Sequence, residues 1–403
     1  MSRENMVSET IRKSIMQHIM QNGSFITSEI SDDTGYSTTT VGKYITQLIE
    51  SGILAEIDKV NLHSKGRRTV RYGIGSEQRY FIGVDISAFE MTIGIMDISG
   101  KMIRIERNAQ FRQNNSHDTL EQILDSVNNL IDTTEGIDKS MILGLNLNLP
   151  GRVNSSKGTS ATIFNFEDTA NTPLVEILSD RMGIPVYIEN DTKAMTYGEY
   201  MSGLSNSYNN LCYINIGWGL GLGLIINGKL YYGKDGYSGE FGHVNLYDNN
   251  VLCHCGKKGC LETEVSGRAI ARKLTERILS GETSVLSGKV KAGGTITMSD
   301  IIMAIKSEDA LCIELISAAG TELGHQLAGL VNILNPDIIM IGGSLSKIES
   351  YYFLQYTKLA IRQYSLKLMN QDVPVVSSSL GDDAAVTGAC LIARNKTMLG
   401  KIG

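Results

Sequence analysis

The most informative part of the sequence is Gly239-Glu240-Phe241-Gly242-His243, together with Cys253-His254-Cys255-Gly256-Lys257-Lys258-Gly259-Cys260-Leu261-Glu262. It contains a one-histidine, three-cysteine set: His243, Cys253, Cys255 and Cys260. Zinc takes four such ligands tetrahedrally, so these side chains would close a structural site that leaves no position for water. The alternatives are chance clustering or a disulfide, but Cys253 and Cys255 are too close to pair comfortably, and three cysteines leave one over. We therefore expect a structural Zn2+ ion.

Two glutamates, Glu240 and Glu262, flank these metal ligands. A metal ion bound by the four ligands would hold both carboxylates beside His243. Carboxylate oxygens accept hydrogen bonds, so rigidly held carboxylates are good receptors for hydroxyl groups.

The composition indicates a protein of more than one domain, since the chain has 403 residues. Its net charge of -6 is uneven, because residues 1–79 carry a net +1 and the remainder carries -7. Any contact with DNA must therefore be local. Neither a signal peptide nor a long apolar run is evident, and the six cysteines fit a reducing compartment. We expect a cytoplasmic protein with no membrane partner.

Residues 1–75 predict a winged helix-turn-helix domain. Isoleucines recur every fourth residue from Ile11 to Ile19, residues 27–34 give a short second helix, and Ser37 can cap a third. The buried stripe of that third helix is expected at Val41, Ile45, Leu48 and Ile49. A hairpin follows, with strands near residues 53–57 and 70–74 and a basic tip.

The third helix and the hairpin are the expected DNA contacts. The helix would reach base edges in the major groove, and the basic residues of the wing, which include Arg71, would contact phosphates. Tyr44 and Gln47 are assigned to the same polar face. The alternative is a winged head that binds protein. The principal candidates for DNA binding are Ser37, Thr38, Thr39, Thr40, Lys43, Lys65, Arg67 and Arg68.

Residues 76–403 contain two similar segments, each of three short strands joined by glycine-bearing turns. The expected strands span residues 81–86, 91–97 and 102–106 in the first segment, and 211–216, 219–226 and 230–232 in the second. Helices are expected at residues 120–131 and 174–181, and buried strands at 141–147 and 186–189. A duplicated α/β body of this kind has a cleft between its lobes, where ligands commonly bind.

Glu189-Asn190-Asp191, the Gly239–His243 motif and the cysteine motif together resemble the ROK family of sugar kinases and sugar-responsive repressors. The head resembles the regulator branch, which includes xylose and N-acetylglucosamine repressors. The resemblance implies an α/β fold class: a winged helix-turn-helix followed by a two-lobed, actin-like body of the ribonuclease-H-like sugar-kinase type. The smaller lobe would span about 76–200 plus a C-terminal helix at about 385–403, and the larger lobe about 201–384.

The resemblance also implies a sugar site formed by Asn190, Asp191, Glu240, His243 and Glu262. One ring nitrogen of His243 would bind zinc and the other would meet the sugar, so metal loss should weaken sugar binding. Two ordinary alternatives stay open: Asp191 could cap the following helix, and Glu262 could be solvated.

Kinases of this family use the aspartate at position 191 as the base and bind ATP phosphates with two glycine-rich loops. Here the first loop reads Asp85-Ile86-Ser87-Ala88-Phe89-Glu90 and has lost both glycines. In the second loop, Gly217–Gly223, Trp218 replaces a small hydroxyl residue. A Cβ hinders close backbone approach to a phosphate, so we expect neither ATP binding nor catalysis, although Asp191 would be the base if the protein were a kinase.

The sequence therefore predicts a sugar-responsive transcriptional regulator, a repressor, whose partners are operator DNA, a sugar or sugar-phosphate effector, and a second copy. We expect a homodimer or a dimer of dimers. The alternatives are an ATP-dependent sugar kinase with a DNA-binding head, and a regulator whose body binds a protein. Selectivity for the sugar is assigned to residues 150–152 and 162–165.

Overall fold

The computed structural model describes residues 3–50, 52–60, 68–75, 79–166, 172–348 and 351–399. The chain forms two compact units, one of Met1–Glu189 with Ala389–Ile402 and one of Asn190–Gly388. It passes between them at Glu189–Asn190 and at Gly388–Ala389. The boundaries predicted near residues 75, 200 and 385 remain predictions.

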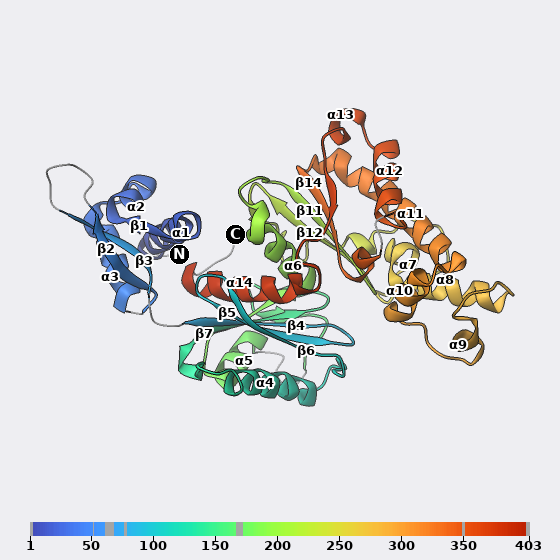
Figure 1. Ribbon diagram of the computed structural model, residues 1–403, viewed down its shortest axis with the longest axis horizontal. Helices are drawn as coiled ribbons and strands as arrows, with labels where there is room; N and C mark the ends of the chain where they lie inside the picture. The colour runs from blue at the N-terminus through green and yellow to red at the C-terminus, as the bar shows by residue number, and fades with distance from the viewer. Residues whose placement is uncertain are drawn as a thin grey trace. The chain divides into compact units, whose positions relative to one another are not determined.

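The head contains the predicted three helices and hairpin (Figure 1). Gly35 ends the second helix at φ +70°, in the left-handed region that favours glycine. Ser37 caps the third helix, since its Oγ accepts a hydrogen bond from Thr40 N at 3.2 Å. The strands pair in the order β1-β3-β2. The elements are α1 (Arg3–Asn22), β1 (Ser24–Ile26), α2 (Thr27–Thr34), α3 (Thr38–Glu50), β2 (Leu54–Val60) and β3 (Thr69–Ile74).

Two side chains of the head differ from the sequence-based expectation. Tyr44 is only 6% exposed and belongs to the core, because it lies three residues after Val41 on the same face of α3. Arg71 donates from Nε and Nη2 to the Asp58 carboxylate at 2.9 and 2.6 Å. Its charge is thus compensated within the wing, and this pairing holds the pKa of Asp58 below its usual value.

The remainder of the first unit is a five-stranded sheet in the order β10-β7-β4-β5-β6. Strands β4, β5 and β6 form an antiparallel meander, and β7 runs parallel to β4. Figure 1 shows α4 and α5 on one face of this sheet and α14 on the other. The elements are β4 (Tyr80–Ile86), β5 (Met91–Asp97), β6 (Met102–Asn108), α4 (His117–Asp132), β7 (Ile142–Leu149), β8 (Val153–Asn154), β9 (Thr159–Ser160), α5 (Leu174–Met182), β10 (Val186–Asn190) and α14 (Ala384–Leu399).

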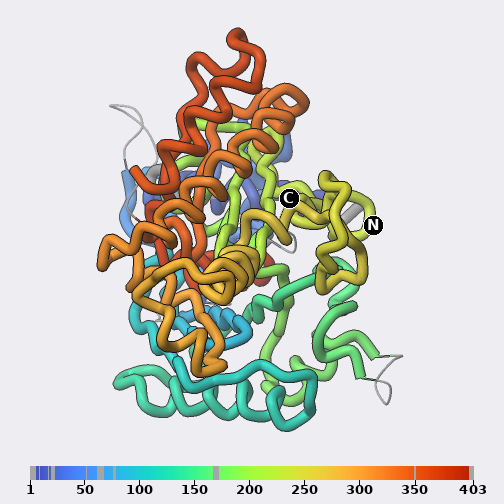
Figure 2. Tube along the Cα trace, turned by 90° about the vertical axis from the view of Figure 1, so that its right-hand side faces the viewer, coloured from blue at the N-terminus to red at the C-terminus, as the bar shows by residue number. Residues whose placement is uncertain are grey.

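The second unit has a sheet in the order β13-β12-β11-β14-β15, in which β12 is antiparallel to β11, and β14 and β15 are parallel to it. The long helix α11 lies beside α12 in both views (Figure 1 and Figure 2). The elements are α6 (Asp191–Glu199), β11 (Leu211–Ile216), β12 (Leu220–Ile226), β13 (Lys229–Leu230), α7 (Glu262–Val265), α8 (Gly267–Leu279), α9 (Ser287–Lys291), α10 (Met298–Lys306), α11 (Ala310–Leu334), β14 (Ile338–Gly342), α12 (Leu354–Tyr364), α13 (Lys367–Asn370) and β15 (Val375–Ser377).

Across the described ranges, no helix combines the length and the apolar character that a membrane crossing requires.

Strand β12 carries glycine at alternate positions where α6 packs against it. A Cβ at Gly221 would overlap the side chain of Thr192, and a Cβ at Gly223 would overlap that of Thr196. Alternate residues of a strand share a face, so the two glycines open one flat strip for the helix. These glycines, which belong to the segment assigned to a phosphate loop, lie inside the strand and serve helix packing.

We expect Gly223→Ala to lower the free energy of unfolding by about 1–3 kcal/mol, because the added methyl group overpacks the interface with Thr196. The matched control is Gly329→Ala in α11, where an added Cβ meets nothing within 4 Å. Alanine is the better helix former, so this control should be neutral or slightly stabilising. Urea unfolding of both variants checks the prediction, and equal stability of the two would contradict it.

Candidate functional site

Asn190 and Asp191 lie where β10 ends and α6 begins. Asn190 caps the helix, since its Oδ1 accepts from Lys193 N at 3.0 Å. Its side-chain amide also donates to Asp191 Oδ1 at 2.9 Å, and Thr192 N donates to the same oxygen at 2.7 Å. The cap is therefore Asn190, and Asp191 presents its carboxylate from the first turn. Burial raises the pKa of the Asp191 carboxyl, and these hydrogen bonds oppose that rise.

Lys193 links the start of α6 to the segment that carries Glu240. The side chain of Lys193 is buried, and its Nζ donates to the carbonyl oxygen of Ser238 at 2.8 Å. A buried ammonium group needs such a partner. Two motifs that are distant in sequence are thus joined by one charge-assisted hydrogen bond. This lysine was not among the residues predicted from the sequence.

The segment from Gly239 to His243 lies with its backbone directly against β12. Leu222 N donates to Gly239 O at 3.2 Å, and a Cβ at Gly239 or at Gly242 would overlap a carbonyl oxygen of β12. The short turn Phe241–His243 then brings Glu240 and His243 together, with Oε2 and Nε2 separated by 3.8 Å.

Glu262 is the first residue of α7 and is only 5% exposed. Its Oε2 accepts from Leu220 N at 3.0 Å, and its Oε1 lies 2.9 Å from His254 Nδ1. The alternative of a solvated Glu262 is therefore wrong.

Glu262 and the start of α6 are neighbours on β12. A Cβ at Gly219 would lie 3.0 Å from Glu262 Oε2, and one at Gly221 would meet Thr192. These glycines are two residues apart on one face, a spacing of about 7 Å along a strand. All three predicted motifs therefore converge on the first half of β12.

The four predicted metal ligands form one cluster. The ligand atoms of His243, Cys253, Cys255 and Cys260 all lie within 4.8 Å of one another. The sulfurs of Cys255 and Cys260 are 3.7 Å apart, and Cys253 Sγ is 3.5 Å from His243 Nδ1. A tetrahedron with Zn–S bonds of about 2.3 Å has edges of about 3.8 Å, whereas a disulfide requires about 2.05 Å. The donor set and its spacing thus fit a tetrahedral metal ion and exclude a disulfide here.

Residues 81–396 match the family model described as "ROK family". The chain belongs to the ROK family. It is 29% identical over 395 residues to the xylose repressor of Caldicellulosiruptor bescii, with 96% of each chain covered. It is similar to the crystal structure of a ROK family transcriptional regulator, a homologue of the E. coli MLC protein, with a TM-score of 0.81, 26% identity, and 98% and 97% of the two chains covered.

The chain is also similar to a ROK family glucokinase from Streptomyces griseus, solved with glucose and AMPPNP. The TM-score is 0.66 at 26% identity, over 78% of this chain and 99% of that one. These likenesses confirm the predicted fold class. The glucokinase matches 78% of this chain, whereas the regulator matches 98% of it.

The two loops that would approach ATP phosphates in a ROK kinase have other partners here. Ser87 Oγ accepts from the backbone amides of Phe89 and Glu90 at 3.4 and 3.1 Å, so the first loop uses these donors internally. In the second loop, the carbonyl oxygens of Gly217 and Trp218 accept from the first two amides of α8 at 2.8 and 3.3 Å.

The remaining predicted residues lie in the first unit. On α3, Ser37, Thr38, Thr39 and Lys43 are exposed, and Thr40 is partly exposed. Arg68 is exposed, whereas Lys65 and Arg67 lie outside the described residues. The two segments assigned to sugar selectivity are adjacent, since Thr162 Oγ1 accepts from Arg152 N at 2.9 Å.

Sequence reasoning also missed a buried polar chain beside Asp85. Asn146 donates to Asn148 at 2.9 Å, and Asn148 donates to Asp85 Oδ1 at 3.0 Å. The alternation of leucine and asparagine in β7 could have indicated these contacts. It was overlooked because it lies within a sequence that resembles an ordinary buried strand.

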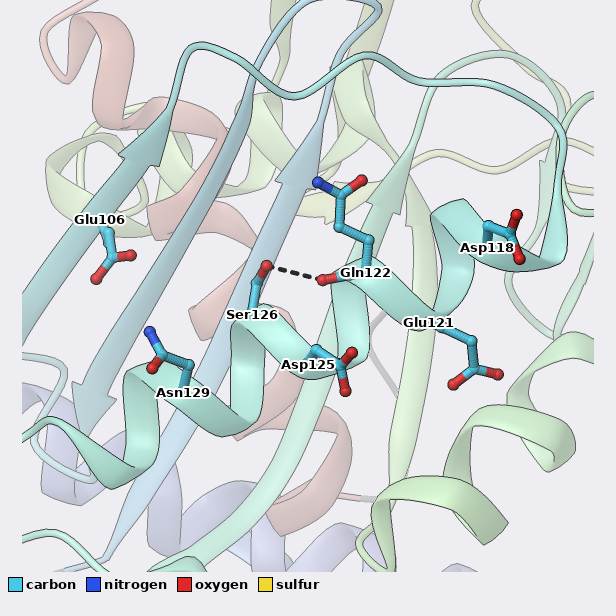
Figure 3. A pocket seen from close by; sticks show the side chains of 7 residues that line it. All are labelled: Glu106, Asp118, Glu121, Gln122, Asp125, Ser126 and Asn129. Atoms are coloured by element: carbon cyan, nitrogen blue, oxygen red, sulfur yellow. Dashed lines mark hydrogen bonds between the residues drawn. The ribbon is translucent and has the colours of Figure 1, made fainter.

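A separate hollow in the first unit contains none of the predicted site residues. Figure 3 shows Glu106 of β6 beside a solvated face of α4 with several acidic side chains. Carboxylates on an exposed helix face are ordinary surface groups. The motif residues therefore remain the candidate site.

We expect Lys193→Met to lower the free energy of unfolding by about 1–3 kcal/mol, because it removes the ammonium group and leaves Ser238 O without this buried partner. Lys234→Met, at an exposed position, is the control and should change little. Chemical denaturation measures both. A Lys193→Met protein as stable as the control would show that the link is dispensable.

Proposed function

We propose that this protein is a sugar-responsive transcriptional repressor. Its winged head binds operator DNA, and its body binds a sugar or sugar phosphate through Asn190, Asp191, Glu240, His243 and Glu262. The single observation that carries this proposal is the convergence on β12 of the three segments that contain those residues, in a chain that also carries a winged helix-turn-helix.

The chemistry of the site suits a polyhydroxylated ligand. Three carboxylates supply acceptors for hydroxyl groups, and the Asn190 side chain supplies both a donor and an acceptor. Each is held by neighbouring backbone or side-chain contacts, which limits the entropy lost when a ligand orders them. Support for a sugar also comes from the names of the relatives, which include a xylose repressor and a glucokinase.

The cluster of His243, Cys253, Cys255 and Cys260 would hold a structural Zn2+ ion. Such an ion supplies a rigid tetrahedral centre. The chain's own residues then do the positioning: the Nδ1 side of His243 faces Cys253, and its Nε2 side faces Glu240. Glu262 follows Cys260 by two residues, so the cluster fixes the ends of both segments that carry sugar receptors.

Retention of Asp191 favours a second candidate, an ATP-dependent sugar kinase with a DNA-binding head. Several features weigh against it: the internal use of the loop amides by Ser87, the bulky Trp218, and the packing role of Gly221 and Gly223. A sensor needs only to bind hydroxyl groups, so these losses do not count against the repressor.

Regulation would follow from a population shift. A sugar that binds one conformation of the chain better than another changes the fraction of heads able to bind DNA. The equilibrium between the two conformations can shift by at most the ratio of the sugar's affinities for them. A homodimer, or a dimer of dimers, would present paired heads to two half-sites one helical turn apart.

We expect the purified protein to contain about one zinc ion per chain, because four protein ligands complete a tetrahedron. Elemental mass spectrometry should show that Cys255→Ser loses the metal and that its melting temperature falls, since metal binding contributes to folding. Cys312→Ala, which alters a buried cysteine outside the cluster, should retain the metal. Full zinc occupancy in Cys255→Ser would contradict the assignment.

We expect a sugar to weaken binding to an operator fragment selected from random DNA. The panel is xylose, glucose, N-acetylglucosamine and the 6-phosphates of the two hexoses, and fluorescence anisotropy measures release. Glu240→Gln should bind DNA normally but lose the response, whereas Glu276→Gln, an exposed ion-pair residue of α8, should behave as wild type. The proposal fails if the protein binds no DNA. It also fails if none of the sugars changes DNA binding or the stability of the protein, while the protein consumes ATP with one of them.

A further inference from the structure

His254 stands between two proposed metal ligands, Cys253 and Cys255, and its Nδ1 is 3.8 Å from Cys253 Sγ but lies nearer to another partner. Its Nδ1 lies 2.9 Å from Glu262 Oε1, and its ring meets the ring of His243 edge-on, with centroids 5.1 Å apart. The side chain of Glu262 is 7% exposed and that of His254 is 51% exposed. A half-exposed imidazole thus covers a buried carboxylate.

Both oxygens of the Glu262 carboxylate are engaged within the protein. Oε2 accepts from the backbone amide of Leu220 at 3.0 Å, and Oε1 faces His254. Two contacts at different oxygens fix both the position and the rotation of the carboxylate plane. Since a carboxylate has about four lone-pair sites, it can still accept ligand hydroxyl groups, but only in the directions that these contacts leave.

Arg268 competes for the same nitrogen of His254. Its Nη1 lies 3.0 Å from His254 Nδ1. One ring nitrogen either donates or accepts, so it cannot serve Glu262 and Arg268 at once. An unmade bond costs more at a buried charged group than at an exposed one, because water satisfies the exposed group. Donation to Glu262 is therefore favoured, and the guanidinium group of Arg268 stays beside the ring, where water can satisfy its donors because Arg268 is exposed.

A second cation at this place is disfavoured. His243, His254 and Glu262 also bring ligand-type atoms within 4.8 Å of one another. The guanidinium group of Arg268, however, sits at the same nitrogen and would repel a cation. The arrangement is better suited to orienting the carboxylate than to binding a metal.

We propose that His254 is a positioning residue that orients the Glu262 carboxylate toward the hydroxyl groups of the effector. The inference rests on the proposed sugar-binding function and deepens it. Because His254 is flanked by two proposed metal ligands, a rigid knuckle (residues 253–260) would hold the Glu262 carboxylate through this side chain as well as through the backbone that follows Cys260. Metal loss then weakens sugar binding by two routes, through His243 and through His254.

The pair is also accessible to a ligand. His254, Glu262 and Arg268 line a cavity of about 290 Å3, together with Val251 and Leu252. A sugar held by Glu262 would therefore have one substituent near this cavity, and the direction in which His254 turns the carboxylate would influence which hydroxyl group binds best.

The test uses the full-length zinc-loaded protein and isothermal titration calorimetry with xylose, glucose and N-acetylglucosamine. We expect His254→Ala to weaken binding about tenfold, the typical effect of losing a group that orients a ligand-binding side chain. His254→Asn should restore most of the affinity, because the side-chain nitrogen of asparagine occupies nearly the place of Nδ1. Glu276→Gln is the control, since Glu276 is exposed on α8 and does not line this cavity, and it should bind as wild type.

Zinc content, measured on the same samples, separates positioning from a structural role. Equal zinc in all variants, with the affinity lost in His254→Ala and regained in His254→Asn, supports the inference. Wild-type affinity in His254→Ala overturns the inference alone, and loss of zinc from that variant overturns it in favour of a structural role in the knuckle. A wild-type protein that binds none of these three sugars, and neither of the 6-phosphates of glucose and N-acetylglucosamine, overturns the proposed function and this inference with it.

Discussion

The strand β12 is the constraint on which the rest of the site depends. It is approached by α6 on its Gly221–Gly223 strip, by the backbone of Gly239–Gly242, and by the Glu262 carboxylate at Gly219 and Leu220. Each approach requires either the absence of a Cβ or a backbone donor. Protein interiors are packed as densely as organic crystals, so there is no free space for a side chain on this strip. An added side chain would push one of the neighbouring segments away from β12. The glycine-rich appearance of the segment is a consequence of that crowding.

The knuckle supplies a second, independent constraint. Its turns depend on Gly256 and Gly259, which have φ values of +87° and +70°, and a Cβ at Gly259 would also overlap Tyr247 O. The knuckle connects the His243 segment to the start of α7 over a few residues. Strand β12 holds Glu262 from one side and the knuckle holds it from the other. The position of the carboxylate is therefore fixed although Glu262 lies on a short helix, α7.

Much of this could be predicted from the sequence, and the reasons for the misses are physical. Hydrophobic periodicity and turn residues predicted the head, the strands β4 to β6 and β11 to β13, and α4, α5, β7 and β10 to within a few residues, but not α8 to α12, β14 or β15. The spacing of the cysteines predicted the metal-ligand cluster. Tyr44 was misplaced because its hydroxyl suggests a polar face, although its ring packs in the core. Lys193 was missed because its partner, Ser238, is distant in sequence. His254 was missed because the sequence does not show that the chain between it and Glu262 turns back and brings the two side chains together.

The fate of Asp191 shows how a kinase framework can serve a sensor. A carboxylate that would accept a proton from a sugar hydroxyl is, before any chemistry, a hydrogen-bond acceptor for that hydroxyl. Its position is set by hydrogen bonds from Asn190 and Thr192. Ser87 can therefore take over the amides of the first loop, and Trp218 can enter the second, without disturbing the acceptor. Binding and phosphoryl transfer use separable parts of this fold, and the packing of β12 and the knuckle keeps in place the parts that we propose to bind hydroxyl groups.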